Sequence, residues 1–310
     1  MPSPQETPKT QLPFGHWPSP LSAQTLASGS ARYGEPKIVT GGIVWPQTLP
    51  EDAGRATLMF SPFTDSSMRS ANASPSGDGE PIALLPAPWN IRSKVHEYGG
   101  GAYALDDVKQ RLYFVNADDQ QIYRYDLHDS GPPQPVTDRP LSRFADLVLH
   151  PFGQWLFAVR ECFDSTDNQH PAASIVAIDL RQEAEPPIAP RVLASGEDFY
   201  AAITVSPSGE KIAFISWCHP NMPWDNTQLW QLQWHCDGTF EKARVLIDSL
   251  SVPAASQSIV QPKYSPNNEL YYVSDKTGWW NIYAYAQQSD KQLPIVAIEA
   301  ECATPQWTFG

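Results

Sequence analysis

The sequence is organised around a short unit that recurs along most of the chain: an apolar strand, a polar turn and a returning strand. The clearest copy spans residues 269–285, where ELYYV and NIYAY flank the polar segment SDKTGWW. Gly278 in that turn can take a positive φ without steric cost, which favours a β-hairpin. Because the unit is repeated, it constrains the fold of the whole chain more than any single motif does.

Five copies can be aligned on an apolar stretch that the pattern predicts to be the second strand of each unit. Three of them follow a turn in which Pro fixes φ and Gly or Asn takes the left-handed position: LVLHPFG at 147–153, ITVSPSG at 203–209 and PKYSPNN at 262–268. Four short antiparallel strands repeated every 40–60 residues or so are typical of β-propeller blades. The aligned second strands are 57–60 (TLMF), 111–115 (RLYFV), 155–159 (WLFAV), 211–215 (KIAFI) and 269–273 (ELYYV).

The pattern therefore predicts an all-β chain, a β-propeller of four-stranded antiparallel blades with about five blades and the start of a sixth. A Pro- and Ser-rich lead occupies 1–34, and the propeller occupies 35–310. A β-sandwich is the alternative, but sandwiches do not repeat one turn chemistry so many times. The blades are expected at 35–92, 93–140, 141–195, 196–255 and 256–300, with a partial sixth at 301–310, where the sequence stops inside a strand–turn pattern.

Composition excludes several classes of function. The net charge is −13 and no basic run occurs, which disfavours nucleic acid as a partner. The four cysteines form no C-x-x-C pair, so reduced thiols are expected rather than a disulfide framework. The first twenty residues have neither the basic nor the apolar part of a signal peptide, and no stretch of about 18 apolar residues predicts a membrane span. A cytoplasmic protein is the expectation.

The stretch 94–103, KVHEYGGGAY, is the most unusual in composition. His96 and Glu97 could form an acid/base pair beside Tyr98, and the three glycines could allow a close backbone approach to a ligand. The pattern is not H-E-x-x-H, because Gly100 stands where the second His is required, so no metal or other cofactor is predicted. The structural alternative is favoured: the glycines let the first strand of a blade bend near the propeller axis.

Two further stretches offer candidate binding residues. The segment 217–225, WCHPNMPWD, is a rigid aromatic loop in which His219 and Trp224 could contact substrate; packing onto its own blade is an equal alternative. Charged residues at 143–146 (RFAD) and 160–161 (RE) are expected mainly in buried ion pairs between blades, with Glu161 as a lesser candidate for binding a substrate ammonium group. No G-x-S-x-G occurs, so no catalytic residue is predicted.

Five of these stretches follow one another in an order that resembles the prolyl oligopeptidase family of serine peptidases, in particular its bacterial acylaminoacyl-peptidase and dipeptidyl-aminopeptidase-like branch. The resemblance runs from residue 33 to residue 310. The stretches are VHEYGGGAY (95–103), RFAD (143–146), HPNMPWD (219–225), SIVQPKYSP (258–266) and SDKTGWWNIY (274–283).

The resemblance implies an N-terminal propeller, seven-bladed in the family, that gates and selects peptide substrates for a C-terminal α/β-hydrolase domain. That domain would carry the Ser-Asp-His triad, and no position in these 310 residues matches it. The implied partners are peptide substrates and the hydrolase domain of the parent protein. Glu161 lies near the place where related aminopeptidases carry a glutamate for the substrate amine. A free-standing propeller that binds proteins or peptides is the alternative function. The candidate substrate-binding or gating residues are His96, Glu97, Tyr98, Glu161, His219 and Trp224.

Overall fold

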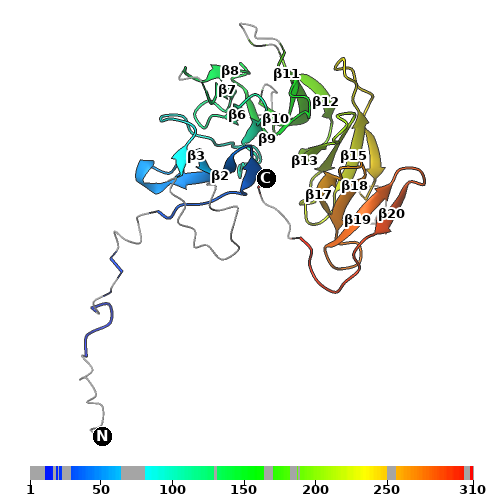
Figure 1. The fold of residues 1–310 in the computed structure, drawn as a ribbon. Helices are drawn as coiled ribbons and strands as arrows, with labels where there is room; N and C mark the ends of the chain where they lie inside the picture. The colour runs from blue at the N-terminus through cyan, green and yellow to red at the C-terminus, as the bar shows by residue number, and fades with distance from the viewer. Residues whose placement is uncertain are drawn as a thin grey trace.

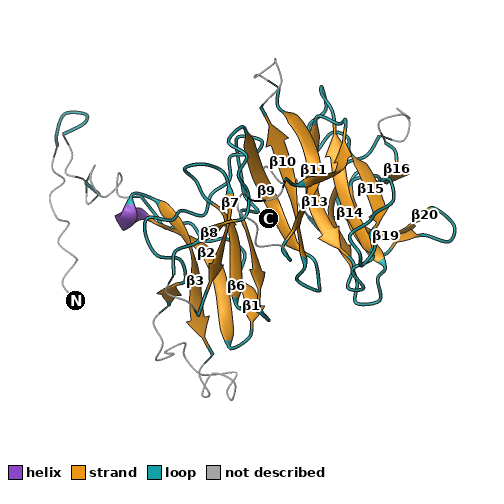
Figure 2. Ribbon diagram, turned by 90° about the horizontal axis from the view of Figure 1, so that it is seen from above, coloured by secondary structure: helices purple, strands orange, loops and turns teal. Residues whose placement is uncertain are grey.

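Antiparallel strands account for nearly all the regular structure of the chain (Figures 1 and 2). The computed structural model describes residues 11–16, 19, 21–22, 29–63, 81–128, 131–163, 170–181, 187, 189–249, 256–303 and 308–309. These residues form twenty strands and one short 3-10 helix, Pro50–Asp52. The predicted lead at 1–34 lies largely outside the described residues.

The strands form five four-stranded sheets, each joining strands that are consecutive in the chain, so the prediction of an all-β chain of four-stranded blades is confirmed. Blade 1 holds β1 (Lys37–Val39), β2 (Gly42–Leu49), β3 (Arg55–Pro62) and β4 (Ile82–Ala83). Blade 2 holds β5 (Tyr103–Asp106), β6 (Arg111–Val115), β7 (Ile122–Asp126) and β8 (Gln134–Pro135). Blade 3 holds β9 (Ser142–Leu149), β10 (Trp155–Cys162), β11 (Ala172–Asp179) and β12 (Arg191–Ser195). Blade 4 holds β13 (Phe199–Val205), β14 (Lys211–Trp217), β15 (Gln228–Gln233) and β16 (Arg244–Ile247). Blade 5 holds β17 (Ile259–Tyr264), β18 (Leu270–Ser274), β19 (Asn281–Ala286) and β20 (Lys291–Pro294).

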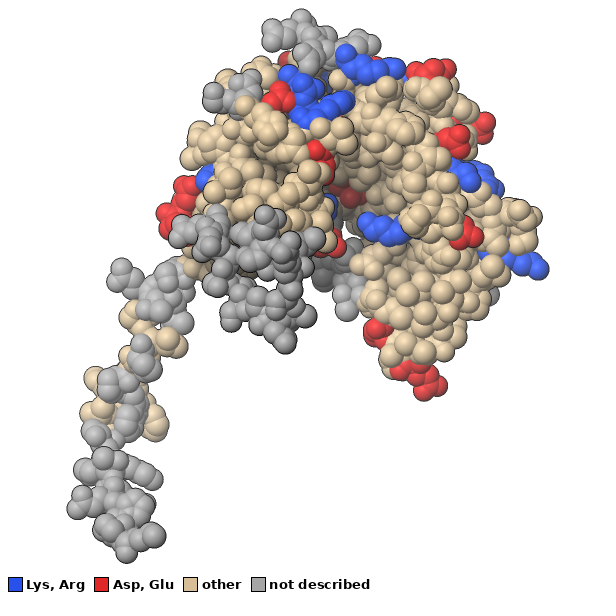
Figure 3. Space-filling model, in the orientation of Figure 1, with Lys and Arg blue, Asp and Glu red and all other residues tan. Residues whose placement is uncertain are grey.

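The blades follow one another in an arc, from the blue and cyan blade 1 to the orange blade 5 (Figure 1). Their first strands lie next to one another, because β5 contacts β9, β9 contacts β13, and β13 contacts β17. The first strands therefore line the centre of the molecule, and the later strands lead outward. Figure 3 shows a hollow at this centre in which both acidic and basic side chains are visible.

The hydrophobic core consists of three clusters that hold neighbouring blades face to face. One cluster joins blades 1 to 3, a second joins blades 3 and 4, and a third joins blades 4 and 5. In the second cluster the Trp234 ring meets Trp155 and Phe157 edge to face, with 5.1 Å between ring centroids in both pairs. Such packing between successive blades, with no single central core, is what a propeller requires.

The first strands share a bulge near the axis. β9, β13 and β17 each shift register once, and the residue at each shift has a left-handed backbone: Asp146 (φ +52), Ala202 (φ +58) and Gln261 (φ +52). Gly101 (φ +51) holds the corresponding place just before β5, and its carbonyl oxygen accepts a hydrogen bond from the Leu147 N–H at 2.9 Å. Bulges re-aim side chains and are frequent beside active sites. Here they place one residue from each of blades 3, 4 and 5 in the lining of a single cavity.

The hairpin predicted for 269–285 is confirmed, since β18 and β19 pair from Leu270 with Tyr285 to Ser274 with Asn281. Gly278 has φ +87 and its N–H donates to the Asp275 carbonyl at 2.7 Å. The alignment of blade 1 is wrong by one strand, because residues 57–60 belong to β3, the third strand of its sheet. The second strand, β2, contains Pro46, and an internal proline masks a strand pattern.

The segment predicted to begin a sixth blade lies at 301–310. Of its described residues, Cys302 donates its N–H to the Trp280 carbonyl at 2.7 Å. Phe309 forms an isolated parallel bridge with Gly100 and brings its ring to the centre of the molecule.

Candidate functional site

A tight turn at 94–99 places three of the predicted residues at the centre. His96 (φ +52) and Glu97 (φ +63) both have left-handed backbones. The turn is closed by hydrogen bonds from the Glu97 N–H to the Lys94 carbonyl (3.0 Å) and from the Gly99 N–H to the Val95 carbonyl (2.9 Å). Five of the six residues from 96 to 101 have positive φ, a conformation that only a sequence rich in glycine adopts at low cost.

The glycines of this stretch are required by close backbone contacts. A Cβ on Gly99 would lie 2.1 Å from the Ser93 carbonyl oxygen, and one on Gly100 would lie 2.1 Å from the Phe309 carbonyl oxygen. These contacts agree with the structural interpretation of the three glycines. They also hold the backbone after His96 directly against Ser93 and Phe309, which keeps His96 near the axis.

Glu161 holds this turn in place from the neighbouring blade. It lies in β10, opposite Arg143 of β9, and its Oε1 accepts the His96 N–H at 3.0 Å. Arg143 Nη1 in turn donates to Glu97 Oε1 at 2.6 Å and to the Lys94 carbonyl at 3.2 Å. Burial raises the pKa of Glu161, and the His96 hydrogen bond and the Arg143 charge counter part of that rise.

Of the residues predicted to form buried ion pairs between blades, Arg143 forms one that is exposed, and Asp146 contacts a backbone group instead. Arg143 and Glu97 do join blades 3 and 2, but the Glu97 side chain is 77% exposed. Asp146 is buried and reaches blade 4 through a backbone group, since its Oδ2 accepts the Ile203 N–H at 2.7 Å. The bulge aims this carboxylate at the N–H of the first strand of the next blade.

Burial raises the pKa of Asp146 to about 6, and the Ile203 hydrogen bond and the charges of Lys263 and Lys37 act against that rise. Both lysines line a cavity that runs along the first strands of all five blades, called here the central cavity. Its lining includes Lys37, Tyr103, Leu147, Ile203 and Lys263.

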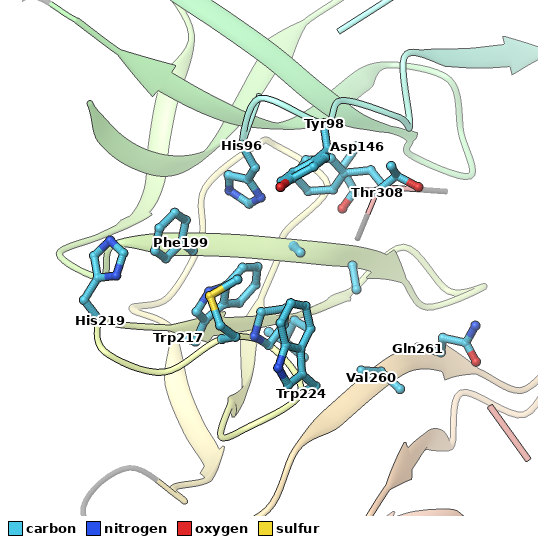
Figure 4. A pocket seen from close by; sticks show the side chains of 16 residues that line it. His96, Tyr98, Asp146, Phe199, Trp217, His219, Trp224, Val260, Gln261 and Thr308 are labelled. Atoms are coloured by element: carbon cyan, nitrogen blue, oxygen red, sulfur yellow. The ribbon is translucent and has the colours of Figure 1, made fainter. Parts of the chain in front are cut away.

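A second cavity, called here the aromatic cavity, has a volume of about 250 Å³ and opens at the end of the axis where the first strands begin (Figure 4). The rings of Phe199 and Trp217 stack against each other, 5.2 Å apart and 13° from parallel. His96 lies edge-on to both, at 5.2 and 5.4 Å, and 4.8 Å from Phe309. The remaining lining includes Tyr98, Asp146, His219, Met222, Pro223 and Trp224.

His96 is the polar group that stands out in this cavity. Its Nε2 is buried and has no hydrogen-bond partner among the described residues. Burial lowers the pKa of His96 to about 4, so the imidazole is neutral at pH 7. A neutral imidazole can accept or donate one hydrogen bond at Nε2, depending on its tautomer.

A third cavity, called here the acidic cavity, adjoins the aromatic one and shares His96, Phe199 and His219 with it. Its charged lining is Glu97, Arg143, Glu161 and Asp198. Because Arg143 pairs with Glu97, the carboxylates of Glu161 and Asp198 remain and give the cavity a net negative charge. An apolar cavity that adjoins an acidic one suits a ligand with an apolar group next to a cation.

The loop after β14 forms one wall of the aromatic cavity, through Met222, Pro223 and Trp224. The His219 N–H donates to Asp198 Oδ2 at 2.9 Å, and the Ser258 hydroxyl of blade 5 donates to the Pro223 carbonyl. The loop is therefore anchored at both ends, and it also faces the cavity.

The structure thus brings all six predicted residues to one end of the axis. His96 and His219 line both cavities, Tyr98 and Trp224 line the aromatic one, and Glu97 and Glu161 line the acidic one. Sequence reasoning missed Asp146 as a cavity residue, and it missed Phe199 and Phe309 altogether. The aromatic start of the blade 4 strand, FY at 199–200, was the available signal for Phe199.

Among the described residues, no group of three or more His, Cys, Asp or Glu side chains is placed to hold a metal ion. No helix in that part of the chain is long and apolar enough to span a membrane.

Solved structures similar to this chain are known, although comparison with family models and with curated proteins finds no match. Puromycin hydrolase superposes with a TM-score of 0.81 and 29% identity, over 97% of this chain and 44% of that enzyme. A puromycin-hydrolyzing peptidase of Mycobacterium tuberculosis gives a TM-score of 0.77 and 31% identity, over 97% of this chain and 43% of that one. The chain corresponds to the β-propeller region of prolyl oligopeptidase-like peptidases.

This propeller region spans less than half the length of the two puromycin-hydrolysing proteins. A more distant prolyl endopeptidase shares only the fold, with a TM-score of 0.56 and 12% identity over 86% of this chain and 36% of that one.

Proposed function

We propose that this propeller region selects and admits peptide substrates for a serine peptidase, whose acyl-transfer chemistry takes place in an α/β-hydrolase domain outside these 310 residues. The observation that carries the proposal is the meeting of the aromatic and acidic cavities at one end of the axis. The likeness to puromycin hydrolase supports it, since a variant of that enzyme has been crystallised in complex with PGG.

The two cavities favour a peptide with a free amino terminus. Glu161 and Asp198 supply negative charge that an ammonium group would match, and the adjoining aromatic cavity can take a side chain. An acylated amino terminus is uncharged and would gain nothing from the acidic cavity. Within the acylaminoacyl-peptidase and dipeptidyl-aminopeptidase-like branch, this arrangement therefore favours release of residues from a free amino terminus.

The proposal includes a cytoplasmic location. All four cysteines are free, and Cys162 is buried. Unpaired cysteines in a chain of this size suit a reducing compartment.

The division of labour can be tested by hydrolysis. We expect the purified 310-residue chain to leave aminoacyl and acyl-aminoacyl p-nitroanilides intact, and a chain extended through the downstream reading frame to cleave them. A serine-directed phosphonate should abolish that activity, because the nucleophile lies in the added part. Hydrolysis by the 310-residue chain would contradict the proposal, because it would place a nucleophile within these residues. Peptide binding by an extended chain that has no peptidase activity would favour the alternative function, a peptide-binding scaffold.

The role of the acidic cavity can be tested by binding. We expect Glu161→Gln to weaken binding of a free-amine peptide to the 310-residue chain about tenfold, because a charge-assisted hydrogen bond is lost. The glutamine oxygen can still accept the His96 N–H, so the turn is kept. Binding of the N-acetylated peptide should not change, and exposed Glu241→Gln is the matched control. Equal binding of free and acetylated peptides to the wild-type chain would contradict the proposal.

A further inference from the structure

The aromatic cavity has the size and lining for one side chain. Its volume of about 250 Å³ lies below the roughly 300–1,000 Å³ of sites for drug-sized molecules. Phe199 and Trp217 present stacked rings on one side, and Trp224 lies on the wall formed by the loop after β14 (Figure 4). Flat rings that enclose a small volume suit an aromatic ring, which packs edge-to-face or offset against them.

One polar atom in this wall lacks a partner among the described residues. His96 Nε2 is buried among the rings of Phe199, Trp217 and Phe309, and it makes no hydrogen bond to the part of the chain that the structure describes. Glu161 holds the His96 backbone, and the three surrounding rings restrict the imidazole. A buried polar atom without a partner is costly, and a ligand that supplies the partner recovers that cost.

The charges near the cavity argue against a cationic side chain. Asp146 also lines the cavity, but its Oδ2 accepts the Ile203 N–H, and Lys263 and Lys37 already act on its charge from the side of the central cavity. The remaining carboxylates, Glu161 and Asp198, belong to the acidic cavity. The group that meets His96 is therefore a neutral one.

A hydroxyl group fits His96 best, because it can donate to or accept from Nε2 and so suits either tautomer. We propose that the aromatic cavity binds the phenol side chain of a tyrosine residue, and that His96 Nε2 hydrogen-bonds its hydroxyl group and makes His96 a specificity-determining residue. This inference rests on the proposed function, since it names the peptide side chain that the propeller region selects.

The test is calorimetric titration of the 310-residue chain with tyrosyl-, phenylalanyl- and leucyl-diglycine. We expect the tyrosyl peptide to bind about tenfold more tightly than the phenylalanyl one, the value of one well-formed hydrogen bond in a buried site. The phenylalanyl peptide should in turn bind more tightly than the leucyl one, because the cavity walls are aromatic.

Two substitutions at His96 separate its hydrogen bond from its packing. His96→Phe keeps a ring in place and should reduce the tyrosine preference to about one, because the hydrogen bond to the tyrosyl hydroxyl is lost. His96→Gln keeps a polar group near the position of Nε2 and should retain part of the preference. Exposed His235→Phe, at a position that lines none of the three cavities, is the control and should behave as wild type.

The outcomes distinguish this inference from the function on which it rests. Equal affinity of the wild-type chain for tyrosyl and phenylalanyl peptides would overturn the tyrosine inference and leave the proposed peptide selection standing, and this comparison needs no variant. An unchanged preference in His96→Phe would overturn the role of His96. Failure of every peptide to bind would contradict the proposed function itself.

Discussion

Replacement of Gly99 by alanine is expected to destabilise the propeller by more than about 3 kcal/mol. Gly99 has φ +68, and a Cβ there would lie 2.1 Å from the Ser93 carbonyl oxygen. Ser93 cannot move aside easily, because it is buried and its hydroxyl donates to the Phe144 carbonyl of β9 at 2.6 Å. The alanine must therefore break the turn at 94–99 and the contact between blades 2 and 3. The midpoint and slope of urea unfolding measure the loss.

Gly278 provides the matched control. It has φ +87, so alanine meets the same backbone strain there, but no atom lies within 4 Å of the added Cβ. Gly278→Ala should cost only about 1–2 kcal/mol, the penalty for a left-handed residue with a side chain. The difference between the two variants isolates the close contact with Ser93. Equal losses of unfolding free energy in the two variants would show that the structure accommodates the added Cβ beside Ser93. Gly99 would then be required only for its backbone conformation.

The blades could be predicted from the sequence because their signals are local. Turn residues such as Pro207 and Gly209 fix the hairpins of one blade without reference to the others. The same locality explains the error in blade 1. Pro46 interrupts the apolar alternation of β2, so the pattern predicts the next apolar stretch, in β3, as the second strand.

The site could be predicted only in part, because its cavities lie between blades. His96 and the loop around His219 stood out by composition, and the fold brings them together around one pair of cavities. Phe309 is absent from the predicted site residues, because its place beside His96 depends on contacts between residues more than 200 positions apart. The bulge at Asp146 has no local signal either, since nothing in RFADLVL marks the aspartate as left-handed.

Asp146 and His96 are two buried titratable groups whose effects on stability oppose each other as pH changes. Burial lowers the pKa of His96 to about 4, below its unfolded value, so its contribution is complete above pH 6.5 and is lost as pH falls toward 4. Burial raises the pKa of Asp146 to about 6, so its ionised form destabilises the fold above pH 6, and stability is regained as pH falls toward 4. In the wild-type chain the two effects act in opposite directions between pH 4 and 6.5.

Asp146→Asn should remove the contribution of Asp146 to the pH dependence of stability and leave that of His96. The amide oxygen can still accept the Ile203 N–H, and asparagine tolerates the left-handed backbone at φ +52, so the bulge should persist. Because no buried charge remains at that position, we expect the free energy of unfolding at pH 7.5 to rise by about 2 kcal/mol. The advantage over wild type should shrink as pH falls through 6 and vanish near pH 4, since wild-type Asp146 is then protonated. Urea unfolding at several pH values measures both.

The matched control for this variant is Asp118→Asn, at an exposed position in blade 2, which should change stability by less than about 0.5 kcal/mol at any pH. A loss of stability in Asp146→Asn at pH 7.5 would mean that Lys263 and Lys37 stabilise the carboxylate by more than its burial costs. The ionised aspartate would then be part of a buried ion network in the central cavity. A gain that persists unchanged to pH 4 would instead place its origin in packing, because only a titrating group can make the difference depend on pH.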